Sequence, residues 1–126
     1  MIQVKEISSE VIFNPQQLQE LIDLDEDGKA TFVKKIVNDY RARSIEVLKQ
    51  IRIKAEEGQL EEVEQLVHSL KSSAAMLGLS RFSKVCGLME LQARNRKPTN
   101  IFLTTLKTEH DLAILAISEF LLSLNE

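Results

Sequence analysis

The chain has 126 residues, of which 44% are hydrophobic and only 5% aromatic, with four Gly and two Pro. This length supports one hydrophobic core and is too short for two ordinary domains, and the composition is typical of an all-α protein built from Leu, Ile, Val and Ala. Nineteen acidic residues against 16 basic ones give a net charge of −3, so nothing indicates a nucleic-acid-binding protein.

No apolar run approaches the roughly 18 residues of a membrane-spanning helix. Residues 1–13 also lack the layout of a secretory signal. We therefore expect a cytoplasmic monomer with no membrane partner, and its initial Met and full set of helices favour a free-standing chain. Cys86 is the single cysteine, so it forms no internal disulfide, and its position on an apolar helix face predicts that it is buried.

Residues 1–13 show little pattern and are expected to form a loosely held lead-in. Asn14 followed by Pro15 is typical of a helix start, and apolar residues at 18, 21 and 22 predict a short amphipathic helix over residues 15–24. The segment DLDEDG, residues 23–28, matches the first half of an EF-hand loop. The twelfth position of such a loop should be Glu and is Lys34 here, so we interpret the segment as an acidic turn.

Four long helices are predicted next, each from apolar residues that recur every three or four positions. Because the loops between them are short, neighbouring helices should pack antiparallel in a four-helix bundle, with the short helix as a lid over one end. The predicted helices are residues 29–55, 59–77, 81–95 and 100–124, in a single domain over residues 1–126.

Particular residues mark the expected helix ends. Gly58 and Gly78 are suited to the left-handed conformation that often follows a helix. Ser80 is expected to cap the third long helix, and Thr99 or Asn100 the fourth, after a break at the preceding proline. The side chains expected to face the core from the first long helix are Phe32, Val33, Ile36, Val37, Tyr40, Val47, Leu48 and Ile51.

His68, in the second long helix, is the sharpest chemical signal in the chain. It lies one residue past Val67 and outside the apolar stripe, so its ring is predicted to reach solvent from a helix whose backbone is held by packing. Lys71 and Ser72 follow one turn later on the same face. The apolar stripe consists of Leu60, Val63, Val67, Leu70, Ala74 and Leu77.

His110 has the opposite setting. It falls on the apolar stripe of the last helix, between Leu106 and Ala113, and is predicted to be a buried packing residue. Two histidines on different helices, with no Cys pair and no His-x-x-x-His spacing, do not make a metal site, so none is expected. A hydrolase and a nucleotide-binding protein are also disfavoured, because the chain has no Gly-x-Ser-x-Gly elbow and no Gly-rich phosphate loop.

An exposed neutral imidazole is a nucleophile near pH 7 when one ring nitrogen is held by a hydrogen bond and the other is free. Phosphoryl transfer asks mainly for positioning and charge stabilisation. Lys71 can face phosphoryl oxygens, and the small residues at 72–75 allow a partner's active site to approach. One exposed Lys contributes about 1 kcal/mol or less, so the partner must supply most of the catalysis.

The string HSLKSSAAMLG from His68 to Gly78, followed by Phe82, Cys86 and Glu90, resembles the histidine-containing phosphotransfer (HPt) domain of multistep two-component signalling. Members of that family typically show His-x-Leu-Lys-Gly-Ser, a Gly ten residues after the His, and a following helix with a Cys and a Leu-Glu pair. The resemblance covers residues 15–96.

The resemblance implies a role for each matching residue. His68 would accept a phosphoryl group on Nε2, Lys71 would balance its charge, Glu90 would hold the imidazole from the next helix, and Gly78 would be the turn glycine. Ser72 stands where the family usually has Gly, and we interpret this departure as tuning of transfer. The residues expected to dock the partner are Glu64, Gln65, Ser72, Ser73, Ala75 and Arg94.

The implied function is that of a phosphocarrier and not of an enzyme. It would take a phosphoryl group from the aspartate of a hybrid kinase's receiver domain and pass it to the receiver aspartate of a response regulator. It would need no cofactor of its own, because Mg²⁺ is held by the receiver. The chain also lacks the acidic residue and Pro that follow the histidine of a sensor kinase, so autophosphorylation from ATP is not expected.

Three alternatives remain open from the sequence. The bundle could bind receivers without chemistry, as a docking adaptor in which Ser72 has spoiled the transfer geometry. It could be a helical interaction protein unrelated to signalling, with His68 an ordinary surface residue. A small enzyme is the third alternative, although no second catalytic group is visible beyond Glu90.

Overall fold

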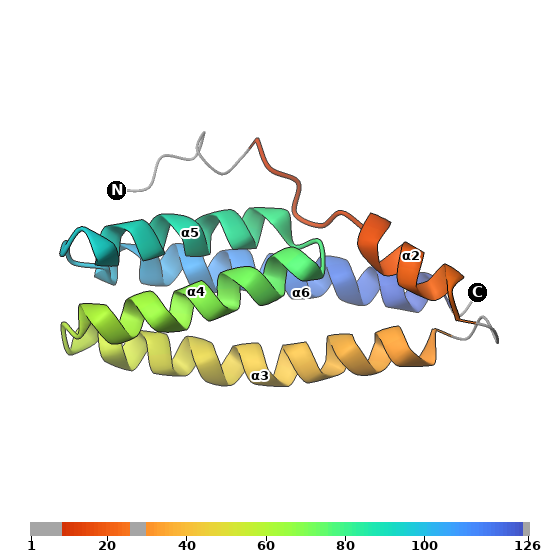
Figure 1. Cartoon of the computed structure of the whole chain (residues 1–126), viewed down its shortest axis with the longest axis horizontal. Coiled ribbons are helices and arrows are strands. Elements are labelled where there is room, and N and C mark those ends of the chain that lie inside the picture. The colour runs from red at the N-terminus through yellow and green to blue at the C-terminus, as the bar shows by residue number, and fades with distance from the viewer. Residues whose placement is uncertain (1–8, 26–29, 125–126) are drawn as a thin grey trace.

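The computed structural model of the chain describes residues 9–25 and 30–124. All regular structure in this part of the chain is helical, and the long helices form an antiparallel four-helix bundle with a short helix at one end (Figure 1). This confirms the predicted all-α fold. The elements are α2 (Gln16–Asp23), α3 (Thr31–Glu56), α4 (Leu60–Met76), α5 (Ser80–Arg94), a 3-10 turn η1 (Asn100–Phe102) and α6 (Leu103–Ser123).

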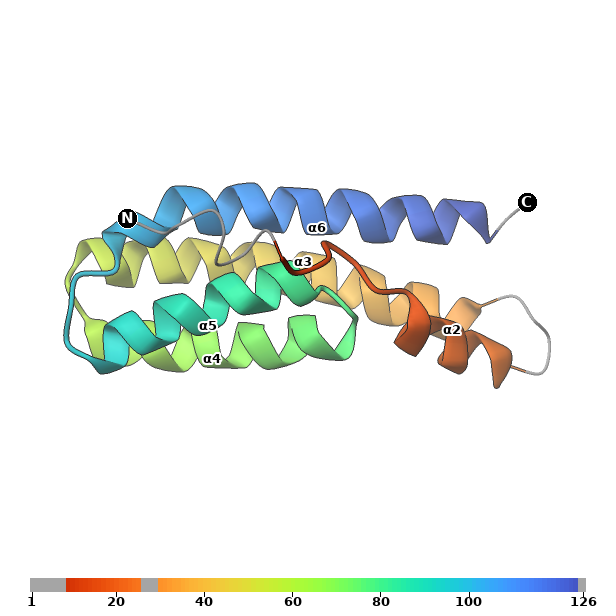
Figure 2. The same ribbon diagram turned by 90° about the horizontal axis from the view of Figure 1, so that it is seen from above.

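The four long helices are arranged in chain order around the core. α3 packs on α4, α4 on α5 and α5 on α6, and α6 returns to contact α3. The α4–α5 pair therefore forms one wall of the bundle and the α3–α6 pair the opposite wall (Figure 1). α3 and α6 extend past the turn between α4 and α5, and α2 lies at that end (Figure 2). Leu18 and Ile22 anchor α2 through buried side chains, so this helix is the expected lid.

The core is built from the apolar stripes that the helical spacing predicts. In α4, Val63, Val67, Leu70 and Ala74 are all buried, and Cys86 is buried in α5. Each such Leu, Ile, Val or Phe side chain stabilises the fold by about 1.5–3 kcal/mol relative to an exposed position. The largest fully buried side chains are Phe82, Leu18, Ile51, Leu79, Met89, Leu106, Ile117, Val33, Val37, Val63, Val67 and Val85.

Phe32 was expected in the core, and this prediction is wrong. Its residue is 61% exposed. α3 begins at Thr31, and Val33 and Val37 take the core-facing positions of its first turns. Phe32 lies about 100° from Val33 around the helix axis and therefore faces solvent. Leu21 of α2 is likewise exposed, because Leu18 and Ile22 alone occupy the side that meets the bundle.

Gly78 ends α4 and makes the tight α4–α5 turn possible. Its φ is +82°, in the left-handed region predicted for it. It also accepts a hydrogen bond of 2.8 Å on its carbonyl from the backbone N–H of Asn14. A Cβ at this position would lie 2.1 Å from the Asn14 carbonyl oxygen, so any side chain would push the two segments apart.

The described part of the N-terminal segment is held more firmly than expected. The Val11 carbonyl accepts a hydrogen bond of 2.9 Å from the backbone N–H of Arg81, in the first turn of α5. The Phe13 ring packs edge-on against Phe120 of α6, with centroids 5.4 Å apart. The prediction of a loose lead-in is therefore wrong for residues 9–13, while residues 1–8 lie outside the described part.

Two predicted helix caps are also wrong. Ser80 is the first residue of α5 and makes no side-chain cap, because a backbone carbonyl from the N-terminal segment already satisfies a free N–H of that turn. Thr99 and Asn100 do not cap α6 directly, because η1 comes between them and the start of α6. The Asn14 side chain does accept a hydrogen bond from Gln16 N–H at 3.0 Å, as expected for the start of α2.

Among the described helices, none combines the length and apolar character that crossing a bilayer requires. Of the acidic turn at residues 23–28, Asp23 ends α2, and residues 26–29 lie outside the described part.

Candidate functional site

His68 lies in the middle of α4, on the side that faces away from the core. The neighbouring Val67 is fully buried, whereas the His68 side chain is 61% exposed. The helix backbone is thus fixed by packing while the imidazole is open to solvent. This is the position that the sequence predicted for it.

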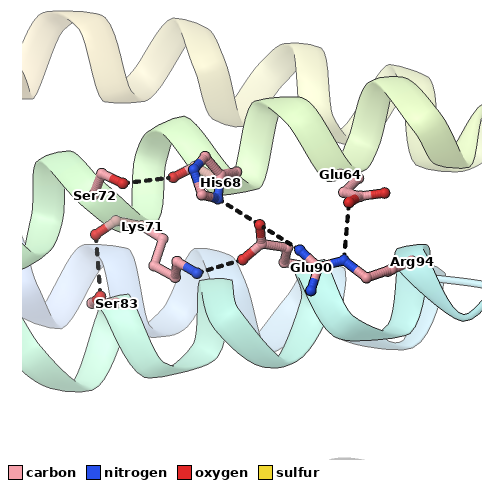
Figure 3. A network of polar contacts seen from close by, with 7 residues as sticks. All are labelled: Glu64, His68, Lys71, Ser72, Ser83, Glu90 and Arg94. Carbon is pink, nitrogen blue, oxygen red and sulfur yellow. Dashed lines mark hydrogen bonds and ion pairs between the residues drawn. The ribbon is translucent and has the colours of Figure 1, made fainter.

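Glu90 of α5 holds the His68 ring from the neighbouring helix. Its Oε2 lies 2.5 Å from His68 Nδ1, although only 5% of the Glu90 side chain is exposed (Figure 3). A carboxylate accepts hydrogen bonds only, so Nδ1 must carry the proton. The Nε2 atom of the neutral ring then keeps its lone pair.

The Glu90 carboxylate accepts from three cationic or polar side chains at once. Besides His68, it binds Lys71 Nζ at 2.5 Å through Oε1 and Arg94 Nη2 at 3.2 Å through Oε2 (Figure 3). Burial alone would raise the pKa of Glu90, but the hydrogen bonds and charges of Lys71 and His68 outweigh it and hold that pKa below its usual value. Glu90 is therefore ionised at neutral pH.

Lys71 lies flat along the α4–α5 interface. Its Nζ reaches Glu90, and a Cβ at Gly87 would come within 3.4 Å of the Lys71 Cδ, so the glycine leaves room for the aliphatic stem. Below it, Ser83 Oγ donates to the Lys71 carbonyl at 3.1 Å (Figure 3). These contacts fix where the ammonium group sits relative to the histidine one turn away.

Arg94 links two carboxylates across the same interface. Its Nε donates to Glu64 Oε2 at 3.1 Å, and its Nη2 donates to Glu90. Glu64 and Arg94, both expected to contact a partner, thus also belong to the network that holds the His68 ring. We call this set, His68, Lys71, Glu90, Arg94 and Glu64, the His68 network.

The other expected docking residues lie around His68 on α4. Gln65, Ser72 and Ala75 are exposed, and Ser73 is half-buried. Ser72 Oγ donates to the His68 carbonyl at 3.2 Å, so its hydroxyl is turned back along the helix (Figure 3). Ser73 does the same toward Ser69 at 3.1 Å. Neither serine hydroxyl therefore projects beside the imidazole, and the surface next to the ring is open to a partner.

His110 is buried, as predicted, with only 3% of the residue exposed. Its Nε2 lies 2.7 Å from Ser44 Oγ, and its ring packs edge-on against Phe82. Ser44 Oγ also donates to the Arg41 carbonyl, so both contacts are satisfied when His110 Nε2–H donates to the hydroxyl. Burial lowers the pKa of His110, which keeps its ring neutral.

The contact between Glu64 and Arg94 was not among the predicted ones, although the sequence contains a signal for it. In an antiparallel helix pair, residues at equal distances from the turn face each other. His68 and Glu90 are each eleven residues from Leu79, and Glu64 and Arg94 are each fifteen. The turn at Gly78 thus fixes the register of the whole network. The ion pair between Arg81 and Glu109, at 2.7 Å, has no such signal because it joins α5 to α6.

Comparison with known proteins agrees with this geometry. A family model described as the Hpt domain matches residues 35–115. Multistep phosphorelay regulator 1 of Schizosaccharomyces pombe is 30% identical over 86 residues, which are 68% of this chain and 28% of that protein. Phosphorelay intermediate protein YPD1 of Candida albicans is 31% identical over 97 residues, which are 77% of this chain and 52% of that protein. The chain thus spans from about a quarter to half of the length of these relatives.

The matched region contains the complete His68 network, from Glu64 to Arg94, and it covers more than half of the chain. The matched residues form most of a four-helix bundle. On it, an exposed histidine is held through Nδ1 by a carboxylate of the next helix. On these grounds the chain belongs to the Hpt domain family.

Proposed function

We propose that this chain is a phosphorelay intermediate that accepts a phosphoryl group on His68 from the aspartate of one receiver domain and passes it to the aspartate of another. The observation that carries the proposal is the 2.5 Å contact between His68 Nδ1 and Glu90 on a ring that is otherwise exposed. The two relatives support it, because their names describe a phosphorelay regulator and a phosphorelay intermediate.

The proposed step is an exchange of one bond to phosphorus for another. The lone pair of His68 Nε2 attacks the phosphorus of an aspartyl phosphate, an N–P bond forms, and the P–O bond to the aspartate breaks. The aspartate leaves as a carboxylate, and the Nδ1 proton stays in its hydrogen bond to Glu90. The reverse step on a second receiver restores neutral His68, so the chain acts as a carrier and not as a kinase.

Glu90 has two roles in this proposal. By accepting from Nδ1 it makes Nε2 the nucleophile, and it balances the positive charge that the ring gains as the N–P bond forms. It also keeps Lys71 beside the ring before the phosphoryl group arrives. The phosphoryl dianion would then compete with Glu90 for Lys71, while Arg94 continues to hold the carboxylate.

The surface around His68 supports docking of a receiver's acidic site. A groove of about 510 Å³ beside the network is lined by both Lys71 and Lys84, and exposed Leu91 forms part of its edge. The two lysines outnumber the one acidic residue of the lining, Glu10, and this positive charge favours an acidic partner. The Mg²⁺ that assists transfer would belong to the receiver.

The decisive experiment charges an isolated receiver domain with radiolabelled acetyl phosphate and mixes it with this chain. We expect an acid-labile, base-stable label on the wild type, identified as phosphohistidine substituted at Nε2. It should be absent from a His68→Gln variant and retained in the matched His110→Gln variant.

A different result would favour the docking adaptor. If the wild type stays unlabelled while amide signals around His68 shift on adding the receiver, the chain binds receivers without chemistry. The exposed Ser72 side chain, one turn from His68, is the feature that would then account for the block.

A further inference from the structure

A groove with a different character lies on the opposite wall of the bundle. Of the four neighbouring pairs of long helices, α3 and α6 pack least closely, and a cavity of about 270 Å³ remains between them. This is close to the lower end of the roughly 300–1,000 Å³ typical of small-molecule sites. Its lining residues are Ile45, Leu48, Lys49 and Arg52 of α3 and Leu103, Leu106, Lys107, His110 and Asp111 of α6.

The floor of this α3–α6 groove is apolar. Leu106 and His110 are buried, Leu48 and Leu103 are half-buried, and Ile45 extends the apolar surface outward with 55% of the residue exposed. The Nε2 atom of His110 is hydrogen-bonded to Ser44 in the interior of the bundle. The floor thus offers an apolar ligand mainly hydrocarbon and ring contacts.

The rim of the groove carries cations that are not neutralised. Lys49 and Arg52 are exposed and form no hydrogen bond or ion pair with any residue in the described ranges 9–25 and 30–124. The acidic residue at the rim, Asp111, is already bound to Lys107 at 3.0 Å. Two free cations therefore face the groove from α3, which carries seven Lys and Arg against three Asp and Glu in a chain that is acidic overall.

The antiparallel pairing gives the groove two distinct ends. Arg52 lies across from Leu103 at one end, and Ile45 lies across from His110 and Asp111 at the other. The seven helical steps from Ile45 to Arg52 make the groove about 10 Å long. Arg52 thus places positive charge at one end of an apolar channel, and Lys49 places it about midway along the same side.

We propose that the α3–α6 groove binds a small amphiphilic anion, with its carboxylate or similar group at Lys49 and Arg52 and its apolar body along Leu48, Leu103 and Leu106. The two cations along the α3 side select an anion, and the apolar floor selects a hydrophobic body. The site faces away from His68, so it is independent of phosphoryl transfer.

The test is a titration of the ¹⁵N-labelled chain with decanoate, kept below its micelle concentration, and followed by amide chemical shifts. We expect saturable shifts confined to the amides of residues 45–52 and 103–111, with those of residues 64–72 unchanged. Decanol, which has the same apolar body without the charge, should bind at least about tenfold more weakly.

Charge variants give the control. A Lys49→Gln/Arg52→Gln double variant should weaken decanoate binding by about tenfold or more, and it should bind decanol as the wild type does. A Lys35→Gln/Arg43→Gln variant removes the same charge from exposed positions of α3 outside the groove and should leave decanoate binding unchanged. All four side chains are exposed, so both proteins should fold.

Several results would overturn the proposal. These are the absence of saturable shifts, shifts spread over other faces of the bundle, or equal weakening in both double variants. Binding of a Glu-rich peptide with no response to decanoate would also overturn it, since recognition would then rest on charge without the apolar floor.

Discussion

The two histidines of this chain show how differently one side chain is used on the two walls of the bundle. His68, on the α4–α5 wall, has an exposed ring held by a buried carboxylate that also binds two cations. His110, on the α3–α6 wall, has a buried ring held by a neutral hydroxyl and packed on Phe82. The carboxylate fixes the Nδ1 proton of His68 and leaves its Nε2 free, whereas burial disfavours positive charge on His110.

The difference separates chemistry from stability. Changes at His68 and Lys71 should alter transfer and leave the fold in place, because both side chains are at least partly exposed. Changes at His110 should lower the stability of the bundle and leave transfer by the folded protein in place.

Truncation of His110 should cost the most stability. His110→Ala removes a buried ring and leaves a cavity beside Phe82 and Ser44, so we expect the free energy of unfolding to fall by about 2–4 kcal/mol. Urea denaturation followed by circular dichroism measures this change. The matched His68→Ala variant should lose less than about 1 kcal/mol. If the free energy of unfolding fell equally in the two variants, the histidines of the two walls would not differ in their contribution to stability.

Truncation of Glu90 should have the largest effect on transfer. Glu90→Ala frees the His68 ring to rotate and to change tautomer, so we expect phosphoryl uptake to slow by about 10–100-fold. Glu90→Gln keeps an oxygen that can accept from Nδ1 and should remain within a few-fold of wild type. Rapid-quench measurement of label transfer from a charged receiver gives both rates.

Glu109 supplies the control for that experiment. It is a second nearly buried carboxylate in an ion pair, with Arg81, but it lies away from the His68 network. Glu109→Ala should lower stability and leave the transfer rate of the folded protein unchanged. A slower transfer in Glu109→Ala than in Glu90→Ala would mean that bundle stability, and not ring orientation, limits the reaction.

Whether a feature of the fold or the site could be predicted from the sequence depends on how far apart in the chain the contacting residues lie. The stripe through Val63 and Val67 fixes which side of α4 is buried, so the exposure of His68 follows from local spacing alone. The pairing of His68 with Glu90 is implied by the family resemblance. It can also be predicted from the sequence, because the two residues are equally far from the α4–α5 turn.

Contacts between elements that no short turn connects could not be predicted. The Val11 carbonyl at α5 and the Arg81–Glu109 pair depend on how whole helices are placed relative to one another, which no periodic pattern records. Phe32 fails for a related reason. Its spacing is compatible with the apolar stripe, but which side of the first turn of α3 is covered depends on the neighbouring helices.

Acidification should reveal His110 through stability. Burial lowers its pKa, with Lys107 adding to this effect and Asp111 opposing it. The unfolded chain, in which the pKa is about 6.5, then binds the proton first, so stability is complete above that value and falls as pH drops below it. The slope should not exceed about 1.4 kcal/mol per pH unit.

Urea midpoints at pH 7.5, 6.5 and 5.5 test this, with His110→Gln as the variant in which the slope is lost. Glu90 does not contribute in this range. Its pKa is lowered by folding, so its stabilisation is lost only as pH falls through that lowered value, in more acidic solution. A slope that survives in His110→Gln would show that another group titrates in this window.

Lys71→Ala should slow transfer modestly. Its ammonium group is partly exposed, so screening limits its effect to about 1 kcal/mol, or roughly fivefold in rate. The melting temperature should stay close to that of wild type. Lys84→Ala removes the same charge from the same groove at a point outside the His68 network and should change the rate less. Unfolding of Lys71→Ala would show instead that the lysine is structural.

Ser72→Gly should have the smallest effect on transfer and tests how close a partner comes to His68. Its hydroxyl is turned back to the His68 carbonyl, so the group already occupies little of the approach. We expect transfer to quicken by less than about fivefold, below the roughly tenfold or more that a misfitting methylene costs in a closed pocket. Stability should fall by about 0.5 kcal/mol, because glycine is less favourable within a helix than serine.

Ser73→Gly serves as the matched variant for this last change. It carries the same helix penalty, but its hydroxyl bonds to Ser69 and its side chain is half-buried. Faster transfer in Ser72→Gly alone would therefore report the contact with the receiver and not helix stability. Slower transfer in Ser72→Gly would reverse the interpretation, since it would mean that the bond from Ser72 to the His68 carbonyl helps to hold the turn that presents the ring.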